Sequence, residues 1–316
     1  MLVACIALLT AEAVQAADVY PARLVRIVVP FAAGGSTDLL TRSVAQQLSE
    51  AWKRPVVVEN RAGGGGIVGS EYVVKAPADG YTLLLGTNTT HAAAATLYSK
   101  LPYDLRRDFA PITEIASIPL LLSVHPSLPV KSVRELVALA KAQPGQLNFG
   151  GGTGAAAHMA MALFESMAKI SMVHVPYKGS GPAMIDLLGG HLSLGFDAVM
   201  TTLPYAQSGK LRTLAVSSLK RSAVAPAVPT MAEAGYAGYE AILWFGLFAP
   251  AGTPPDIVKK INEETARGVA TPKMRELLAS QGLEIIVSSP ADFAIRVDRE
   301  IIKWRRVILD AGIKLE

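Results

Sequence analysis

Residues 27–38 read Ile-Val-Val-Pro-Phe-Ala-Ala-Gly-Gly-Ser-Thr-Asp, and later parts of the chain repeat this pattern. The apolar run from Leu24 to Pro30 predicts a buried parallel strand. Two glycines then permit a sharp turn, and one of the polar residues at 36–38 is predicted to cap a helix over residues 39–52. The first amides of a helix lack partners within it and carry partial positive charge, so the turn predicts a site for a carboxylate or phosphate. The alternative is a turn that only connects strand to helix.

The same order of strand, small-residue turn and helix recurs along the chain. A predicted strand at 147–149 runs into Gly-Gly-Gly-Thr-Gly and then into an apolar helix over residues 155–168. This alternation favours parallel sheets covered on both faces, in which ligands bind beyond the carboxyl ends of the strands. We therefore expect the first glycine turn (residues 31–38) and the second glycine turn (residues 150–155) to face each other. Further strands are predicted at 55–59, 81–85, 119–124, 192–196, 211–217 and 243–250.

Several helix starts are marked by polar residues and prolines. Ser132 with Glu135, and Thr230 with Glu233, have the spacing of a capping box. The segments 253–256 and 289–292 place proline at the first helical position after a polar cap, with an acidic residue in the first turn. An alanine-rich helix is expected to end near Tyr98.

The composition indicates a globular protein long enough for two domains. The 316 residues carry a formal charge of +4 and are 51% hydrophobic, and their basic residues are scattered, so we expect no nucleic-acid partner. Residues 1–17 contain an apolar run followed by small residues, which predicts a signal peptide and an exported protein. The only cysteine, Cys5, lies in that segment, so the mature chain lacks disulfide and thiol chemistry.

An enzyme is the main alternative class, and the sequence gives it little support. The five histidines show no helical metal-ligand spacing, and no Gly-x-Ser-x-Gly motif occurs. The four glycines at 63–66 are not followed by the Lys-Ser or Lys-Thr of a phosphate-binding loop. We therefore predict no catalytic residue, no metal and no cofactor.

Many short segments, in order, carry a family resemblance. They include Ile27 to Phe31 with Gly34-Gly35, Val58-Glu59-Asn60-Arg61, Ala78-Asp79-Gly80-Tyr81-Thr82, Val175-Pro176-Tyr177-Lys178-Gly179 and Gly246 to Pro254. Together they resemble the extracytoplasmic receptors of the tripartite tricarboxylate transporter group, the TctC or Bug family. The resemblance covers nearly the whole mature chain.

The resemblance implies a type II periplasmic-binding-protein fold, α/β in class, with two doubly wound lobes joined by two crossing strands. The first lobe would comprise residues 18–119 and 243–316, and the second lobe residues 120–242. It implies a periplasmic monomer that closes on a small carboxylate and delivers it to membrane transporter subunits. A sensor that reports ligand to a membrane signalling partner is the alternative, as is a ligand that is a neutral amide or an aromatic carboxylate.

In that family, backbone amides of the two glycine turns hold the ligand. Asp197, after Phe196, could accept a bond from a ligand hydroxyl or amine, or could merely cap the next helix. His158 is expected to pack or line the cleft rather than to catalyse. The first turn lacks the proline common in relatives, and the second lacks their serines or threonines and is one residue short. The predicted ligand-binding residues are Phe31, Ala33, Gly34, Gly35, Ser36, Thr37, Asp38, Thr87, Asn88, Gly151, Gly152, Thr153, Gly154, Ala155, His158, Tyr177, Lys178 and Asp197.

Overall fold

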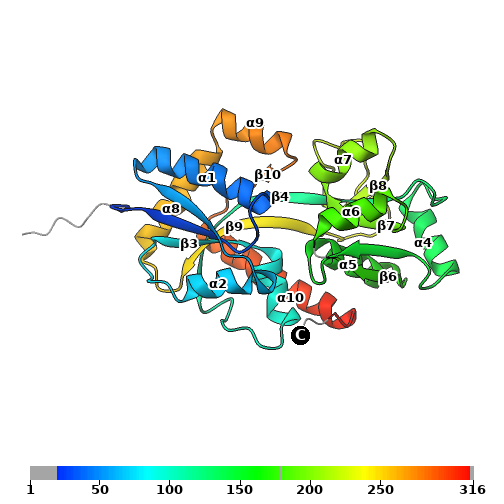
Figure 1. Ribbon diagram of the computed structural model, residues 1–316, viewed down its shortest axis with the longest axis horizontal. Helices are drawn as coiled ribbons and strands as arrows, with labels where there is room; N and C mark the ends of the chain where they lie inside the picture. Colours follow the sequence, from blue (N-terminus) through cyan, green and yellow to red (C-terminus); the bar gives the residue numbers. More distant parts are fainter. Residues whose placement is uncertain (1–19, 178, 314–316) are drawn as a thin grey trace, which may run out of the picture.

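Two α/β lobes joined by two long strands make up the structure (Figure 1). The computed structural model describes residues 20–177 and 179–313, so the predicted signal peptide lies outside the described residues. The strands form one sheet in the order β2-β1-β3-β9-β4-β7-β5-β6, and β8 and β10 also pair with β4. They are β1 (Val25–Val29), β2 (Val56–Asn60), β3 (Thr82–Thr87), β4 (Phe109–Val124), β5 (Asn148–Gly151), β6 (Val173–Pro176), β7 (Leu194–Ala198), β8 (Arg212–Val216), β9 (Ile242–Pro250) and β10 (Glu284–Ile285).

Helices follow most of the strands and cover both faces of the sheet (Figure 1). None of the helices in the described residues is long and apolar enough to cross a membrane. The α-helices are α1 (Ser36–Trp52), α2 (Ile67–Val74), α3 (Ala94–Leu97), α4 (Val133–Ala142), α5 (Ala156–Ala168), α6 (Ser180–Leu188), α7 (Val199–Gln207), α8 (Pro255–Val269), α9 (Pro272–Ser280) and α10 (Pro290–Asp310), with a 3₁₀ turn η1 (Gly64–Gly66) and a π-turn η2 (Thr89–Ala93).

Strand β1 is buried on both faces, as the apolar run around it predicts. Successive side chains of a strand point to opposite faces, so Ile27 packs in a core with α1 and α8, while Val28 packs in a core with α2 and α10. Both side chains are fully buried, and each such burial contributes roughly 1.5–3 kcal/mol. The strand is therefore fixed from both sides, and the turn that follows it starts from a rigid support.

The strands β4 and β9 run between the lobes (Figure 1). The first lobe contains parallel β1, β2 and β3 with α1, α2 and α8 to α10, and the second contains parallel β5 and β6 beside β7 and β8 with α4 to α7. Within β4, Pro119 still pairs with β9, whereas Leu120 pairs with β7. The predicted lobe boundary at 119 and 120 stays a prediction, but it coincides with this change of partner.

The predicted strand at 119–124 is only the last part of β4, which begins at Phe109. The strand contains Pro111 and Pro119, although proline cannot donate to a sheet ladder. The structure accommodates Pro111 at an irregularity, where the register against β9 shifts between Pro111 and Thr113. A single 16-residue strand thus takes part in both lobes.

Three predicted helix starts need correction. Helix α1 begins at Ser36 with Gly35 as its N-cap and no side-chain cap, so the predicted cap at 36–38 is wrong. Helix α8 has Pro254, not Thr253, as its N-cap, and Pro255 takes the first helical position. Thr230 and Glu233 exchange both capping-box hydrogen bonds, at 2.9 and 3.0 Å, yet residues 231–235 form turns.

The alanine-rich segment is also less regular than predicted, since it divides into the π-turn η2 and the four-residue α3. The cap at Ser132 is confirmed, because its side chain accepts from the Glu135 amide. The cap at Ser289 is confirmed by the bond from the Asp292 amide. Helix α9 was not predicted.

Candidate functional site

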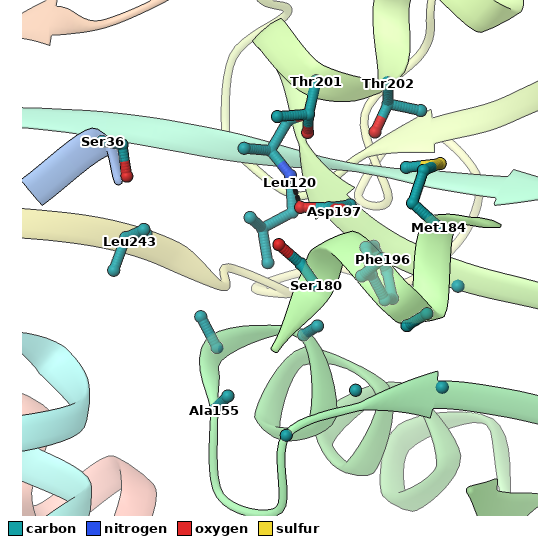
Figure 2. Close-up of a pocket in the computed structure, with 18 of the residues that line it drawn as sticks. Ser36, Leu120, Ala155, Ser180, Met184, Phe196, Asp197, Thr201, Thr202 and Leu243 are labelled. Carbon is teal, nitrogen blue, oxygen red and sulfur yellow. Dashed lines mark hydrogen bonds between the residues drawn. The ribbon is translucent and has the colours of Figure 1, made fainter. Parts of the chain in front are cut away.

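A cavity of about 490 Å³ is lined by both lobes at the carboxyl ends of several strands. Its volume lies within the about 300–1,000 Å³ typical of small-molecule sites. The first residues of four helices contribute to its wall, namely those of α1, α5, α6 and α7. Figure 2 shows Ser36 of α1, Ala155 before α5, Ser180 of α6 and Thr201 of α7 around this space.

The helices α1 and α5 present unpaired amides at the cavity. The amides of residues 36–38 and of residues 156–158 have no hydrogen-bond partner among the described residues. The N-caps Gly35 and Ala155 both lack a side-chain cap and both line the cavity. Because these amides carry the positive end of the helix dipole, the two turns can bind an anion without a basic side chain.

The Asp38 carboxylate holds the first glycine turn in shape. It accepts hydrogen bonds from the amide of Gly34 at 2.9 Å, from Nε of Arg42 at 3.0 Å and from Nδ2 of Asn60 at 2.9 Å. Burial by itself would raise the pKa of Asp38, but these hydrogen bonds outweigh it and hold the pKa below its usual value. Gly34 has a φ of +87°, a conformation that glycine adopts most readily. Asp38 is thus a support of the turn and does not line the cavity.

Two stacked histidines support the second glycine turn. The rings of His158 on α5 and His174 on β6 lie 3.8 Å apart between centroids and 9° from parallel. The Gly154 amide donates to Nδ1 of His158 at 3.1 Å, and Nε2 of His174 donates to the Gly151 carbonyl at 3.0 Å. Burial, and then the neighbouring His174, lower the pKa of His158 to about 4, so His158 is neutral and able to accept at neutral pH.

Asp197 is the charged side chain that lines the cavity within the described residues. Its Oδ1 accepts from the amide of Ala198 at 2.7 Å, next to the start of α7. Burial raises the pKa of the Asp197 carboxyl, while hydrogen bonds from Ala198 and Thr201 act in the opposite direction. In Figure 2 the side-chain oxygens of Asp197, Ser180 and Thr201 are directed toward the same space. A ligand hydroxyl or amine there would find an acceptor.

The structure brings ten of the predicted ligand-binding residues to the cavity wall and sets others behind it. Those that line the wall are Phe31, Gly34, Gly35, Ser36, Thr37, Thr87, Gly151, Gly152, Ala155 and Asp197. Those that do not are Ala33, Asp38, Asn88, Thr153, Gly154, His158 and Tyr177, and Lys178 lies outside the described residues. Which of them bind a ligand stays a prediction.

Tyr177 donates its hydroxyl to Asp186 and packs against the second lobe. Helices α6 and α7 contribute cavity residues that were not predicted, namely Ser180, Met184, Thr201 and Thr202. The Gly-Ser-Gly at 179–181 after a short strand is the same local signal as in the glycine turns and could have indicated Ser180. Within the described chain, no group of three or more His, Cys, Asp or Glu side chains is placed to hold a metal ion.

Two α/β lobes crossed by two strands, with a cavity lined by helix starts between them, define a solute-binding protein with the type II periplasmic-binding-protein fold. Residues 40–313 match the model of the tripartite tricarboxylate transporter family receptor. The chain therefore belongs to the TctC or Bug receptor family, which confirms the resemblance seen in its sequence.

Relatives match over most of their length. The chain is 38% identical over 302 residues to Protein BugT of Bordetella pertussis, covering 95% of this chain and 93% of that protein. The structure of R. palustris Rpa4515 with adipate is similar with a TM-score of 0.84 and 40% identity, over 93% of this chain and 99% of that chain. The structure of MatC from Rhodopseudomonas palustris with bound malate has a TM-score of 0.80 and 32% identity, over 92% of this chain and 100% of that chain.

Proposed function

We propose that this protein is a periplasmic receptor that captures a small organic carboxylate between its lobes and delivers it to a membrane transporter of the tripartite type. The single observation that carries the proposal is the pair of helix starts, α1 and α5, whose unpaired amides line one cavity. The adipate and malate in the structures of two relatives support the same ligand class. Residues 1–17 would export the chain, which would act as a monomer without catalysis.

Calorimetric titration tests the carboxylate part of the proposal. Carboxylates of three to eight carbons are compared with the amides of the same acids at pH 7.5. We expect at least one carboxylate to bind and its amide to bind at least tenfold more weakly, because hydrogen bonds to a charged group are roughly twice as strong as neutral ones. Equal affinity for acid and amide would contradict an anion site.

A Gly35→Val variant tests the place of binding. The position has a φ of −78°, and a Cβ added there meets no atom within 4 Å, so the fold accommodates the change while the side chain enters the cavity. Affinity should fall at least tenfold, while the melting temperature should fall only slightly, because valine is a poorer N-cap for α1 than glycine. Ala51→Val, at an exposed position near the far end of α1, is the matched control and should bind like the wild type. Uptake of the bound acid by vesicles that contain the membrane subunits, only with the receptor present, tests delivery.

A further inference from the structure

The cavity continues beyond Asp197 into a pouch within the second lobe. Its floor is formed by small residues of three strands, Ser123 of β4, Gly150 of β5 and Gly195 of β7. Its other wall comes from α6, α7 and the segment before β7, through Met184, Leu187, Leu192 and Thr202. In Figure 2, Met184 lies on the far side of Asp197 from Ser36. The pouch is thus separate from the first glycine turn, and Asp197 lies between them.

Gly195 keeps space free in the floor of the pouch. A Cβ at Gly195 would lie 3.7 Å from Cδ2 of Leu187, so any longer side chain there would fill the pouch. Gly150 instead packs directly against its neighbours, because a Cβ there would come within 2.5 Å of Cδ1 of Leu192, 2.8 Å of Cε2 of Tyr177 and 3.1 Å of Cβ of Ala183. Since protein interiors are close-packed, a volume kept free beside apolar side chains suits the apolar body of a ligand.

Two buried hydroxyls in the pouch lack partners. Oγ of Ser123 and Oγ1 of Thr202 have no hydrogen bond among the described residues, and both side chains are 1% exposed. Both residues line the cavity. Buried polar groups are nearly always hydrogen-bonded, so these two point to a polar group of a ligand, or to a water that the ligand displaces.

The one charged side chain beside the pouch among the described residues, Asp197, disfavours a second negative charge there. Among the described residues, no Lys or Arg lines the cavity, and Asp197 stands at the entrance of the pouch. A carboxylate placed there would lose its hydration and approach the carboxylate of Asp197, with no Lys or Arg side chain among the described lining residues to compensate. A ligand hydroxyl or carbonyl has no charge to repel Asp197 and can form hydrogen bonds with the hydroxyls of Ser123 and Thr202.

We propose that this pouch accepts the uncharged body of a monocarboxylate, so that the protein prefers an acid with an apolar body and a distal hydroxyl to a dicarboxylate of the same length. The inference rests on the proposed function, since the glycine turns must hold the single carboxylate. It gives this chain a ligand class that differs from the adipate and malate in the structures of its relatives.

Three acids of six carbons test the preference: hexanoate, 6-hydroxyhexanoate and adipate, titrated by calorimetry at pH 7.5. We expect 6-hydroxyhexanoate to bind at least tenfold more tightly than adipate. From propionate to hexanoate, affinity should rise about threefold to fourfold per methylene as each group is buried. Adipate bound as tightly as 6-hydroxyhexanoate would overturn the inference and leave the proposed function intact. Failure of every carboxylate to bind would overturn the proposed function and the inference with it.

Variants locate the effect in the pouch. Gly195→Val should weaken hexanoate at least tenfold and change propionate less than threefold. An unchanged dependence on chain length in Gly195→Val would overturn the inference. Met184→Lys adds a cation to the pouch and should lower the preference against adipate at least tenfold. Ile185→Lys adds the same charge on the same helix at a side chain that is 70% exposed, and should leave the preference unchanged. A Met184→Lys effect no larger than that of Ile185→Lys would also count against the pouch.

Discussion

At the scale of the residue, Asp38 shows how one carboxylate can shape a binding turn without touching a ligand. Three hydrogen bonds, from Gly34, Arg42 and Asn60, hold it in a nearly inaccessible position with 2% exposure. Its charge is matched by Arg42 one helical turn later. The amides of the first glycine turn are therefore positioned before any ligand arrives.

Asp38→Ala should destabilise the protein by about 2–4 kcal/mol, because the Gly34 amide and the Arg42 guanidinium lose their acceptor and Asn60 keeps only its bond to the Phe31 carbonyl. The measurement is the free energy of unfolding in urea at pH 7. Asp298→Ala is the control, since it removes an exposed ion pair with Arg106 and should cost no more than about 0.5 kcal/mol. Equal losses in the two variants would contradict the supporting role of Asp38.

At the scale of the element, the second glycine turn depends on the contact between α5 and β6. His158 and His174 come from these two elements, stack on each other and each hold one residue of the turn. The Gly154 amide requires an unprotonated Nδ1 on His158, so protonation of that ring would remove the bond. Low pH should therefore weaken the second glycine turn by protonating His158 on α5.

His158→Gln should have a lower free energy of unfolding than the wild type at pH 7. This difference in free energy, the gap, should shrink as the pH falls from 6.5 toward 4. The folded pKa of about 4 lies below the unfolded value of 6.5, so the unfolded chain binds more protons in this window and the wild type loses stability there. The change in the gap should reach up to about 3 kcal/mol.

Burial raises the pKa of Glu114 and of Glu165 to about 7, so their protonation stabilises the folded chain as the pH falls through the same window. Because this effect is opposite to that of His158, the contribution of His158 is measured as the difference between the variant and the wild type. His191→Gln, at an exposed position, is the control. A gap between wild type and His158→Gln that stays constant from pH 7 to 4.5 would contradict the role given to His158.

At the scale of the whole molecule, the two lobes share one core. A single cluster of buried residues includes Val28 and Phe109 of the first lobe, Phe149 and Phe164 of the second, and Trp304 of α10. Helix α10 packs against α5, and β4 passes through both lobes without a break. These contacts tie the lobes together.

Calorimetric unfolding should accordingly show a single transition, although the chain has two lobes. Because the shared core and β4 would be lost together, neither lobe has a separate boundary at which to unfold. A bound carboxylate at a hundred times its Kd should add about 2.7 kcal/mol to the free energy of unfolding and shift that one transition. Two resolved transitions, or a ligand that moves only one of them, would contradict this expectation.

Local interactions determined much of the fold in advance. The strand before the first glycine turn and the caps at Ser132 and Ser289 follow from neighbouring residues, because periodicity and capping act over a few positions. The family followed from the resemblance of many short segments in order, which the family model confirms. The position of both glycine turns at one cavity was also predictable, since parallel strands bring their carboxyl ends to one edge.

Only the tertiary structure decided the rest. Pro111 reads as a break in the sequence, yet β9 carries the strand past it. Asp38 reads as a helix cap, but Asn60 and Arg42 turn its carboxylate back to Gly34. The pouch joins Ser123, Gly150 and Gly195, which meet only because β4, β7 and β5 are neighbours in the sheet. Contacts of this range depend on the strand order, and no local hydrogen bond or periodicity encodes them.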